Sequence, residues 1–179
     1  MESKDTNREN WFAAKVFNNR ISEIEDFISK GGYESYVATH VKAFKLPDGR
    51  VKHRKVPLIN SLLFFKASVE NAKKLERELF GRMRIYRTAS SVADLAVIPD
   101  DQMRVFRLAT ATEADGLEYL GADTATYSVG QQVLVTGGPF EGTVGRIFRI
   151  KGDKRLVVTI DGVCAVATSY IPACFLQKI

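Results

Sequence analysis

The fold of the second half of this 179-residue chain is decided by the stretch Val133-Leu134-Val135-Thr136-Gly137-Gly138-Pro139-Phe140-Glu141-Gly142-Thr143-Val144-Gly145-Arg146-Ile147. Val133 and Val135 are two residues apart, as inward side chains of one strand are. Its glycines permit a tight loop and a bend before the next strand, which we expect to start at Ile147. The fold-determining positions are Val133, Val135, Gly138, Phe140, Gly142, Gly145 and Ile147.

The surrounding sequence predicts an all-β module over residues 128–179. Short runs of Val, Ile and Thr at 156–160 and 163–167 are typical of strands, and glycines separate them. Such a pattern favours a small barrel, which residues 170–179 would close. The β-branched residues and glycines disfavour helix, so we expect this module to stay β when separated from the rest of the chain.

The first 110 residues have a different pattern, in which strand-like and helix-like segments follow one another. Apolar residues at helical spacing are followed by Gly31-Gly32, which predicts a helix end. The expected class is therefore α+β. The expected strands are 10–17, 33–44, 61–67 and 83–86, the helices are 21–28, 69–80 and 99–109, and a turn at 47–49 precedes the basic run 50–55.

Charge divides the chain into three parts. Residues 1–110 carry a net charge of +6, residues 111–127 carry four acids and no base, and residues 128–179 carry +3. We expect domains at 1–110 and 128–179, joined by an acidic linker at 111–127. The basic first domain indicates a polyanionic partner such as nucleic acid. An ordinary solvated surface is the alternative.

Several functional classes are disfavoured. The longest apolar stretch, residues 56–65, is interrupted and far shorter than the about 20 residues of a membrane span, and the first ten residues lack a secretory signal, so we expect a cytoplasmic protein. Cys164 and Cys174 suggest reduced thiols rather than a disulfide or zinc site. His40 and His53 have no matched nucleophile, so we expect no catalytic site, metal or cofactor.

The stretch 133–147 resembles the KOW motif of NusG-type factors and of some ribosomal proteins. Residues 10–110 look like the NusG amino-terminal domain. The resemblance rests on Trp11-Phe12, the segment 57–65, Arg87-Thr88 and Ile98-Pro99-Asp100-Asp101. It implies an antiparallel sheet flanked by helices, followed by a small SH3-like KOW barrel.

One departure points to a specialised branch. Where general NusG factors read Phe-Pro-Gly-Tyr, this chain has Ile59-Asn60-Ser61-Leu62. It is similar here to the UpxY-type antiterminators of Bacteroides, which act on capsular polysaccharide operons. The resemblance thus implies a transcription elongation or antitermination factor for long operons, with a general NusG-type elongation and termination factor as the alternative.

The resemblance also implies partners and sites. An apolar patch would bind the clamp helices of RNA polymerase. The alternative for each of its residues is that it simply belongs to the hydrophobic core. We expect Ile59, Leu62 and Phe64 to be accessible. The residues matched to the patch are Ile59, Leu62, Phe64, Met103 and Phe106.

Basic residues are expected to contact non-template DNA or nascent RNA by neutralising phosphates, which reads no sequence. In relatives the barrel reaches a small-subunit ribosomal protein or Rho, and we expect a monomer. A solvated hairpin face is the alternative for the basic set. Its members are Lys15, Arg20, Arg50, Lys52, Arg54 and Lys55.

Two rival functions remain. A ribosome-associated RNA-binding protein would also use a KOW barrel, although residues 10–110 disfavour it. An enzyme with an accessory barrel would need a buried carboxylate or histidine in a deep cleft of the first domain.

Overall fold

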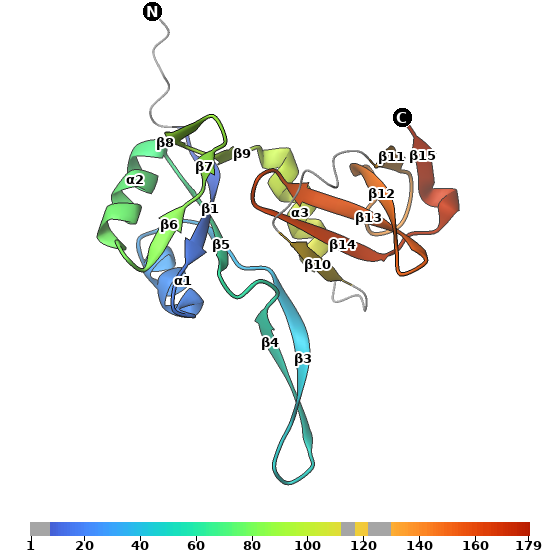
Figure 1. The fold of residues 1–179 in the computed structure, drawn as a ribbon, viewed down its shortest axis with the longest axis horizontal. Helices are drawn as coiled ribbons and strands as arrows, with labels where there is room; N and C mark the ends of the chain where they lie inside the picture. The colour runs from blue at the N-terminus through green and yellow to red at the C-terminus, as the bar shows by residue number, and fades with distance from the viewer. Residues whose placement is uncertain (1–7, 112–116, 122–129) are drawn as a thin grey trace, which may run out of the picture. The chain divides into compact units, whose positions relative to one another are not determined.

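The computed structural model describes residues 8–111, 117–121 and 130–179. Its described part is mostly β-sheet with three α-helices, as the α+β prediction requires (Figure 1). Contacts divide the chain into two units: residues 1–38 with 57–100, and residues 39–56 with 101–179. Most of the expected linker lies outside the described residues, and the expected domain bounds stay a prediction.

The sheet of the first unit is built around one strand. Strand β1 (Asn10–Val16) pairs antiparallel with β5 (Leu62–Ala67) on one side, and with β6 (Met83–Ile85) and β9 (Val97–Ile98) on the other. The short strand β2 (Ser35–Tyr36) continues the sheet beyond β5.

Two helices supply the core of this unit. The amphipathic helices α1 (Ile21–Lys30) and α2 (Val69–Glu78) bury their apolar sides, and the Ser68 hydroxyl caps α2 by accepting a hydrogen bond from Asn71 N at 3.2 Å. The cluster that joins helices and sheet includes Phe12, Ala14, Ile24, Ile28, Leu63, Phe65, Leu75, Leu79, Met83 and Ile85.

Two features of the first 100 residues differ from prediction. The expected strand 33–44 is divided into β2 and β3 (Thr39–Lys45). A small hairpin of β7 (Arg87–Thr88) and β8 (Ser91–Leu95) was not predicted, because β8 buries only Leu95 and therefore lacks an apolar alternation.

Strands β3 and β4 (Val51–Pro57) form a two-stranded ribbon, which is the predicted basic hairpin (Figure 1). At its turn Gly49 has φ +83°, which favours glycine. The Asp48 carboxylate accepts hydrogen bonds from Arg50 N at 3.0 Å and from Arg50 Nε at 2.7 Å. The turn is therefore closed by its own side chains.

The second unit contains a six-stranded antiparallel sheet in the order β10-β14-β13-β12-β11-β15. Its last strand, which lies in the segment 170–179 expected to close the module, pairs with β11, whereas closure into a barrel stays a prediction. Strand β10 lies inside the expected linker, and α3 (Asp100–Ala111) belongs to this unit from Asp101 on. The strands are β10 (Glu118–Gly121), β11 (Gln131–Val135), β12 (Val144–Ile150), β13 (Asp153–Ile160), β14 (Cys164–Tyr170) and β15 (Leu176–Lys178), with a 3₁₀ turn at Ala173–Phe175.

The glycine-rich stretch folds largely as predicted. Val133, Val135 and Phe140 are buried, whereas Gly138 and Gly142 have positive φ in the loop. The next strand begins at Val144 rather than at Ile147, because the loop closes earlier through hydrogen bonds between Val135 and residues 142 and 143.

Gly145 lies on β12 beside the fully buried Leu156. A Cβ at Gly145 would come within 2.5 Å of Leu156 Cδ1, so this position excludes any larger residue unless the core shifts.

We predict that Gly145→Ala lowers the free energy of unfolding of this unit by about 1 to 3 kcal/mol, the usual cost of overpacking. Chemical denaturation of the full chain measures it. In the double variant Gly145→Ala with Leu156→Val, the clashing methyl is removed. Its free energy of unfolding should therefore fall by less than the sum of the falls in the two single variants. Additive losses would show that Leu156 is not the obstacle.

Candidate functional site

The predicted apolar patch begins on the face of β1 and β5 that points away from the helix cluster. In the antiparallel register Ala13 lies opposite Phe64 and Lys15 opposite Leu62, so these four side chains share one face. Phe12 and Phe65 lie opposite each other on the helix-covered face, with ring centroids 5.8 Å apart. Because side chains alternate along each strand, the sheet has one face in the helix-covered core and a second apolar face.

The exposure of this second face was predicted wrongly. Leu62 and Phe64 are 4% and 1% exposed, and only Ile59 is half-buried. Part of the physical reason lies in their position: β5 is an inner strand, so Phe64 is covered on its flanks by Ala13 on one side and Tyr36 on the other. A large side chain on an inner strand is flanked by neighbours on both sides.

The two remaining patch residues, Met103 and Phe106, lie on α3 in the second unit and are also buried. Their spacing of three residues puts them on one side of the helix, together with Thr110. The Thr110 hydroxyl donates a hydrogen bond to the Phe106 carbonyl oxygen at 2.8 Å, which satisfies its polar group in a buried position. The five predicted residues therefore form two groups: Ile59, Leu62 and Phe64 in the first unit, and Met103 and Phe106 in the second.

A lysine borders the apolar face of the first unit. Lys66 lies opposite Trp11 in the register, with its Nζ 6.0 Å from the centroid of the Trp11 ring. The same Nζ is 3.4 Å from an Asp100 carboxylate oxygen. The aliphatic stem of Lys66 can therefore extend the apolar surface while its charge is balanced at the margin.

Two of the predicted nucleic-acid residues, Lys15 and Arg20, lie near the start of α1. Lys15 is exposed and lies opposite Arg84 of β6, which adds a cation that sequence reasoning missed. Arg20 precedes α1 and forms an exposed ion pair with Glu23 at 3.9 Å, and Glu23 also pairs with Arg82 at 3.2 Å. Exposed pairs of this kind are weak, so a phosphate can compete for these cations.

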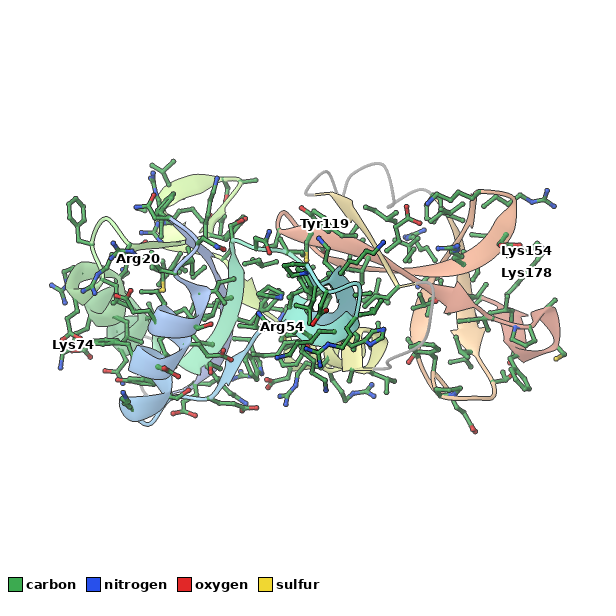
Figure 2. The ribbon with its side chains drawn as sticks, turned by 90° about the horizontal axis from the view of Figure 1, so that it is seen from below. Arg20, Arg54, Lys74, Tyr119, Lys154 and Lys178 are labelled. Carbon is green, nitrogen blue, oxygen red and sulfur yellow. The ribbon has the colours of Figure 1, made fainter. Side chains whose placement is uncertain are left out.

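The other four predicted cations lie on the ribbon. Residues 39–57 contain six Lys or Arg and one Asp, a net charge of +5. Every residue of 41–45 and 51–55 is exposed (Arg20 and Arg54 are labelled in Figure 2). The Arg50 guanidinium pairs with Asp48, with Nη2 2.7 Å from Oδ2, and this pairing lowers the pKa of the Asp48 carboxyl.

Lys52, Arg54 and Lys55 follow Arg50 along β4. Lys52 and Arg54 are two residues apart and share one face, whereas Lys55 points to the other. Sequence reasoning missed Lys42, Phe44 and Lys45 on the partner strand, although the period of two along 39–45 offered a signal.

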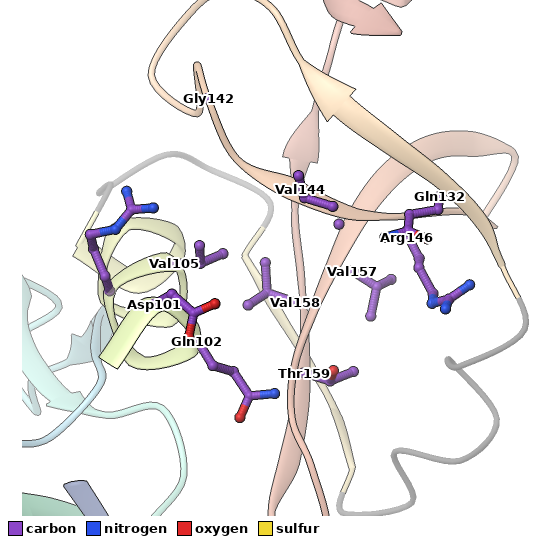
Figure 3. A pocket seen from close by; sticks show the side chains of 12 residues that line it. Asp101, Gln102, Val105, Gln132, Gly142, Val144, Arg146, Val157, Val158 and Thr159 are labelled. Carbon is purple, nitrogen blue, oxygen red and sulfur yellow. The ribbon is translucent and has the colours of Figure 1, made fainter. Parts of the chain in front are cut away.

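A pocket of about 370 Å³ lies within the second unit, between α3 and the sheet (Figure 3). The side chains of Val105 and Val158 approach each other across it, and Asp101 and Gln102 lie beside them. Arg146 on its far side donates a hydrogen bond from Nη1 to the Gly130 carbonyl oxygen at 2.8 Å. The lining has a single carboxylate and lacks a histidine or cysteine, so it offers no nucleophile and base pair.

Outside the pocket, the most buried ion pair has a structural role. Glu76 Oε2 pairs with Arg87 at 2.5 Å, and Glu76 Oε1 accepts a hydrogen bond from Ile85 N at 2.8 Å. This carboxylate therefore ties α2 to β6 and β7. Within the described residues no three His, Cys, Asp or Glu side chains gather as a metal site, and no helix is long and apolar enough to cross a membrane.

Comparison with known proteins gives distant likenesses among solved structures only. No family model matches the chain, and no curated protein matches it. Among solved structures, it is similar to NusG of Thermotoga maritima, in a structure described as "Domain interaction in Thermotoga maritima NusG". The TM-score is 0.46 and the identity 18%, over 96% of this chain and 98% of that chain. A likeness of this size does not assign a function to the chain.

The two cysteines are both free thiols, as predicted, but they differ in chemistry. Cys164 is buried in β14, and this burial raises its pKa to about 12, whereas Cys174 is exposed. Because only the thiolate reacts, Cys164 should be inert at neutral pH.

We predict that a thiol reagent at about pH 8 modifies one cysteine per folded chain and both after denaturation. The absorbance of released nitrothiobenzoate counts them, and Cys174→Ser serves as control because it should leave no fast-reacting thiol. The raised pKa also means that the contribution of Cys164 to stability is complete below about pH 8.5 and is lost as the pH rises toward 12. Rapid modification of Cys164 in the folded chain would contradict its burial.

Proposed function

We propose that this protein is a NusG-type transcription elongation and antitermination factor that binds RNA polymerase and promotes transcription of long operons, among them surface polysaccharide operons. The observation that carries the proposal is the glycine-rich stretch 133–147, which resembles the KOW motif in sequence. Val133, Val135 and Phe140 are buried, and Gly145 fits against Leu156. The order of elements before it supports the same family.

The proposed polymerase contact uses the apolar face of β5 with Ile59 at its margin. Burying one Leu or Phe against a partner contributes roughly 1.5 to 3 kcal/mol, and association consumes much of that. A few anchor residues then account for a modest affinity. Since Leu62 and Phe64 are buried in the structure, the proposal requires that this face become accessible to the polymerase clamp helices.

The proposed nucleic-acid contact uses exposed cations. Lys15 and Arg84 lie side by side at one end of the sheet, and the ribbon carries a further +5. Each phosphate that these groups neutralise releases counterions, which gives affinity without sequence preference. Such contacts suit a factor that follows the polymerase along many sequences.

The polymerase contact is tested best at Ile59. Aspartate at the fully buried Phe64 or Phe106 is expected to unfold the unit, because an unpaired charge would enter the core. Ile59 is half-buried, so Ile59→Asp should leave the chain folded. We predict that it weakens binding to purified core RNA polymerase by about tenfold or more, the loss of one anchor residue, as measured by biolayer interferometry.

Val92→Asp is the matched control, because Val92 is 86% exposed on β8 and lies outside the predicted patch. It should bind as the unchanged chain does. If folded Ile59→Asp combined with Leu62→Ala binds polymerase normally, the patch is wrong. Copurification with ribosomal subunits and without polymerase would instead support the ribosome-associated alternative.

The specialised role predicts a distinct transcription pattern. In a strain lacking the gene, nascent-transcript sequencing should show loss of promoter-distal reads in one or a few long operons, while the rest of the genome is unchanged. Uniform effects across all genes would favour a general elongation factor.

A further inference from the structure

The ribbon formed by β3 and β4 has two unlike faces. The hydrogen bonds at its two ends, Leu46 N to the Arg50 carbonyl and Leu58 N to the Ala38 carbonyl, are both 2.8 Å long. They fit one unbroken antiparallel register, which puts Phe44 opposite Lys52 and Lys42 opposite Arg54. These four side chains therefore share one face of the ribbon.

This face joins an exposed aromatic ring to a row of cations. Phe44 is 39% exposed, and Lys42 Nζ lies 5.7 Å from its ring centroid. Lys52 and Arg54 continue the row on the neighbouring strand, where no residue of 51–55 is buried. Among residues 41–45 and 51–55, the other face carries Val41, Lys45, His53 and Lys55, and its one ring is the His53 imidazole, which is smaller and more polar than a phenyl ring.

We propose that the Phe44 face of this ribbon binds single-stranded nucleic acid, with one base stacked on the Phe44 ring and phosphates held by Lys52 and Arg54. The inference deepens, and rests on, the nucleic-acid part of the proposed function. It adds a stacking residue and assigns the contact to one face of the ribbon, so that Lys55, which the sequence placed in the binding set, lies outside the proposed contact.

Charge and spacing support this occupant. The ribbon's net charge of +5 favours a polyanion over a neutral or basic protein surface. Residues two apart on a strand are separated by about 6.8 Å, which is twice the about 3.4 Å that each phosphate occupies along a stacked strand. Lys52 and Arg54 can therefore reach alternate phosphates of one strand.

The aromatic ring decides between single and double strands. A two-stranded ribbon fits the major groove of a duplex, but base faces are covered there by their stacked neighbours. An unpaired base has a free face that stacks on an aromatic side chain regardless of its identity. Phe44 thus favours a single strand of either DNA or RNA, since both present the same base faces and phosphates.

The test uses the full chain and fluorescein-labelled 12-nucleotide oligomers, which are longer than the seven-residue strands of the ribbon at about 3.4 Å per nucleotide and per residue, with binding followed by fluorescence anisotropy. Arms of single-stranded DNA, single-stranded RNA of the same sequence and the matching DNA duplex separate the ligand forms. We expect tighter binding to one or both single strands than to the duplex. The reverse order would overturn the inference.

Two matched pairs of variants test the face. Phe44→Ala should weaken single-strand binding by about fivefold or more without changing its salt dependence, because stacking is not ionic. Lys52→Gln with Arg54→Gln should weaken binding and reduce the salt slope by about 1.4, for two phosphates of a single strand. The controls lie on the other face: Val41→Ala matches Phe44→Ala, and the double variant Lys45→Gln with Lys55→Gln matches the double charge variant. Each control should weaken single-strand binding clearly less than its counterpart.

A fluorescence readout detects stacking directly. The only tryptophan of the chain, Trp11, is buried, so an exposed indole on the ribbon can be followed separately. Phe44→Trp should retain binding, and its emission should be quenched on adding the single strand. Val41→Trp, on the opposite face, should show little quenching.

Equal losses from both faces, an unaffected Phe44→Ala variant, or equal quenching at both positions would each overturn the inference. All variants lie on exposed strands, and unchanged thermal unfolding confirms that they remain folded. The assay contains no polymerase, so its failure leaves the Ile59 experiment untouched. Likewise, the effect of Ile59→Asp on polymerase binding does not determine the effect of Phe44→Ala on nucleic-acid binding.

Discussion

The pairing of β1 with β5 is the constraint on which the first unit depends. Six consecutive residue pairs join the two strands, and β1 also carries β6 and β9. One face of this pair holds Phe12 and Phe65 against α1 and α2. Because side chains alternate, the same pairing necessarily presents Phe64 and Leu62 together on the other face. Core and candidate patch are two results of one register.

The second unit depends on close approach rather than on large side chains. Strands β11 and β12 bring Val133 opposite Gly145, and the missing side chain of Gly145 leaves room for Leu156. Strand β15 then pairs with the other edge of β11. A motif read in the sequence as a loop signal is thus also a packing device between strands.

The sequence predicted the elements with strong apolar patterns, such as the run 61–67 and the helices α1 and α2. It missed β8, which buries only one of its residues. Alternation showed that Leu62 and Phe64 share a face but carried no information on whether that face is exposed. Phe44 was overlooked for a related reason: an aromatic residue in an expected strand suggests core, and only its exposure on the ribbon shows otherwise.

The ribbon also has an evolutionary consequence. Its strands bury little of residues 41–45 and 51–55, and its turn is closed locally by Asp48 and Arg50. Exposed positions of this kind change folding free energy by less than about 0.5 kcal/mol when substituted. Mutation can therefore vary the ribbon's side chains almost independently of the fold, which makes residues 41–55 a module whose binding preference can diverge between related proteins.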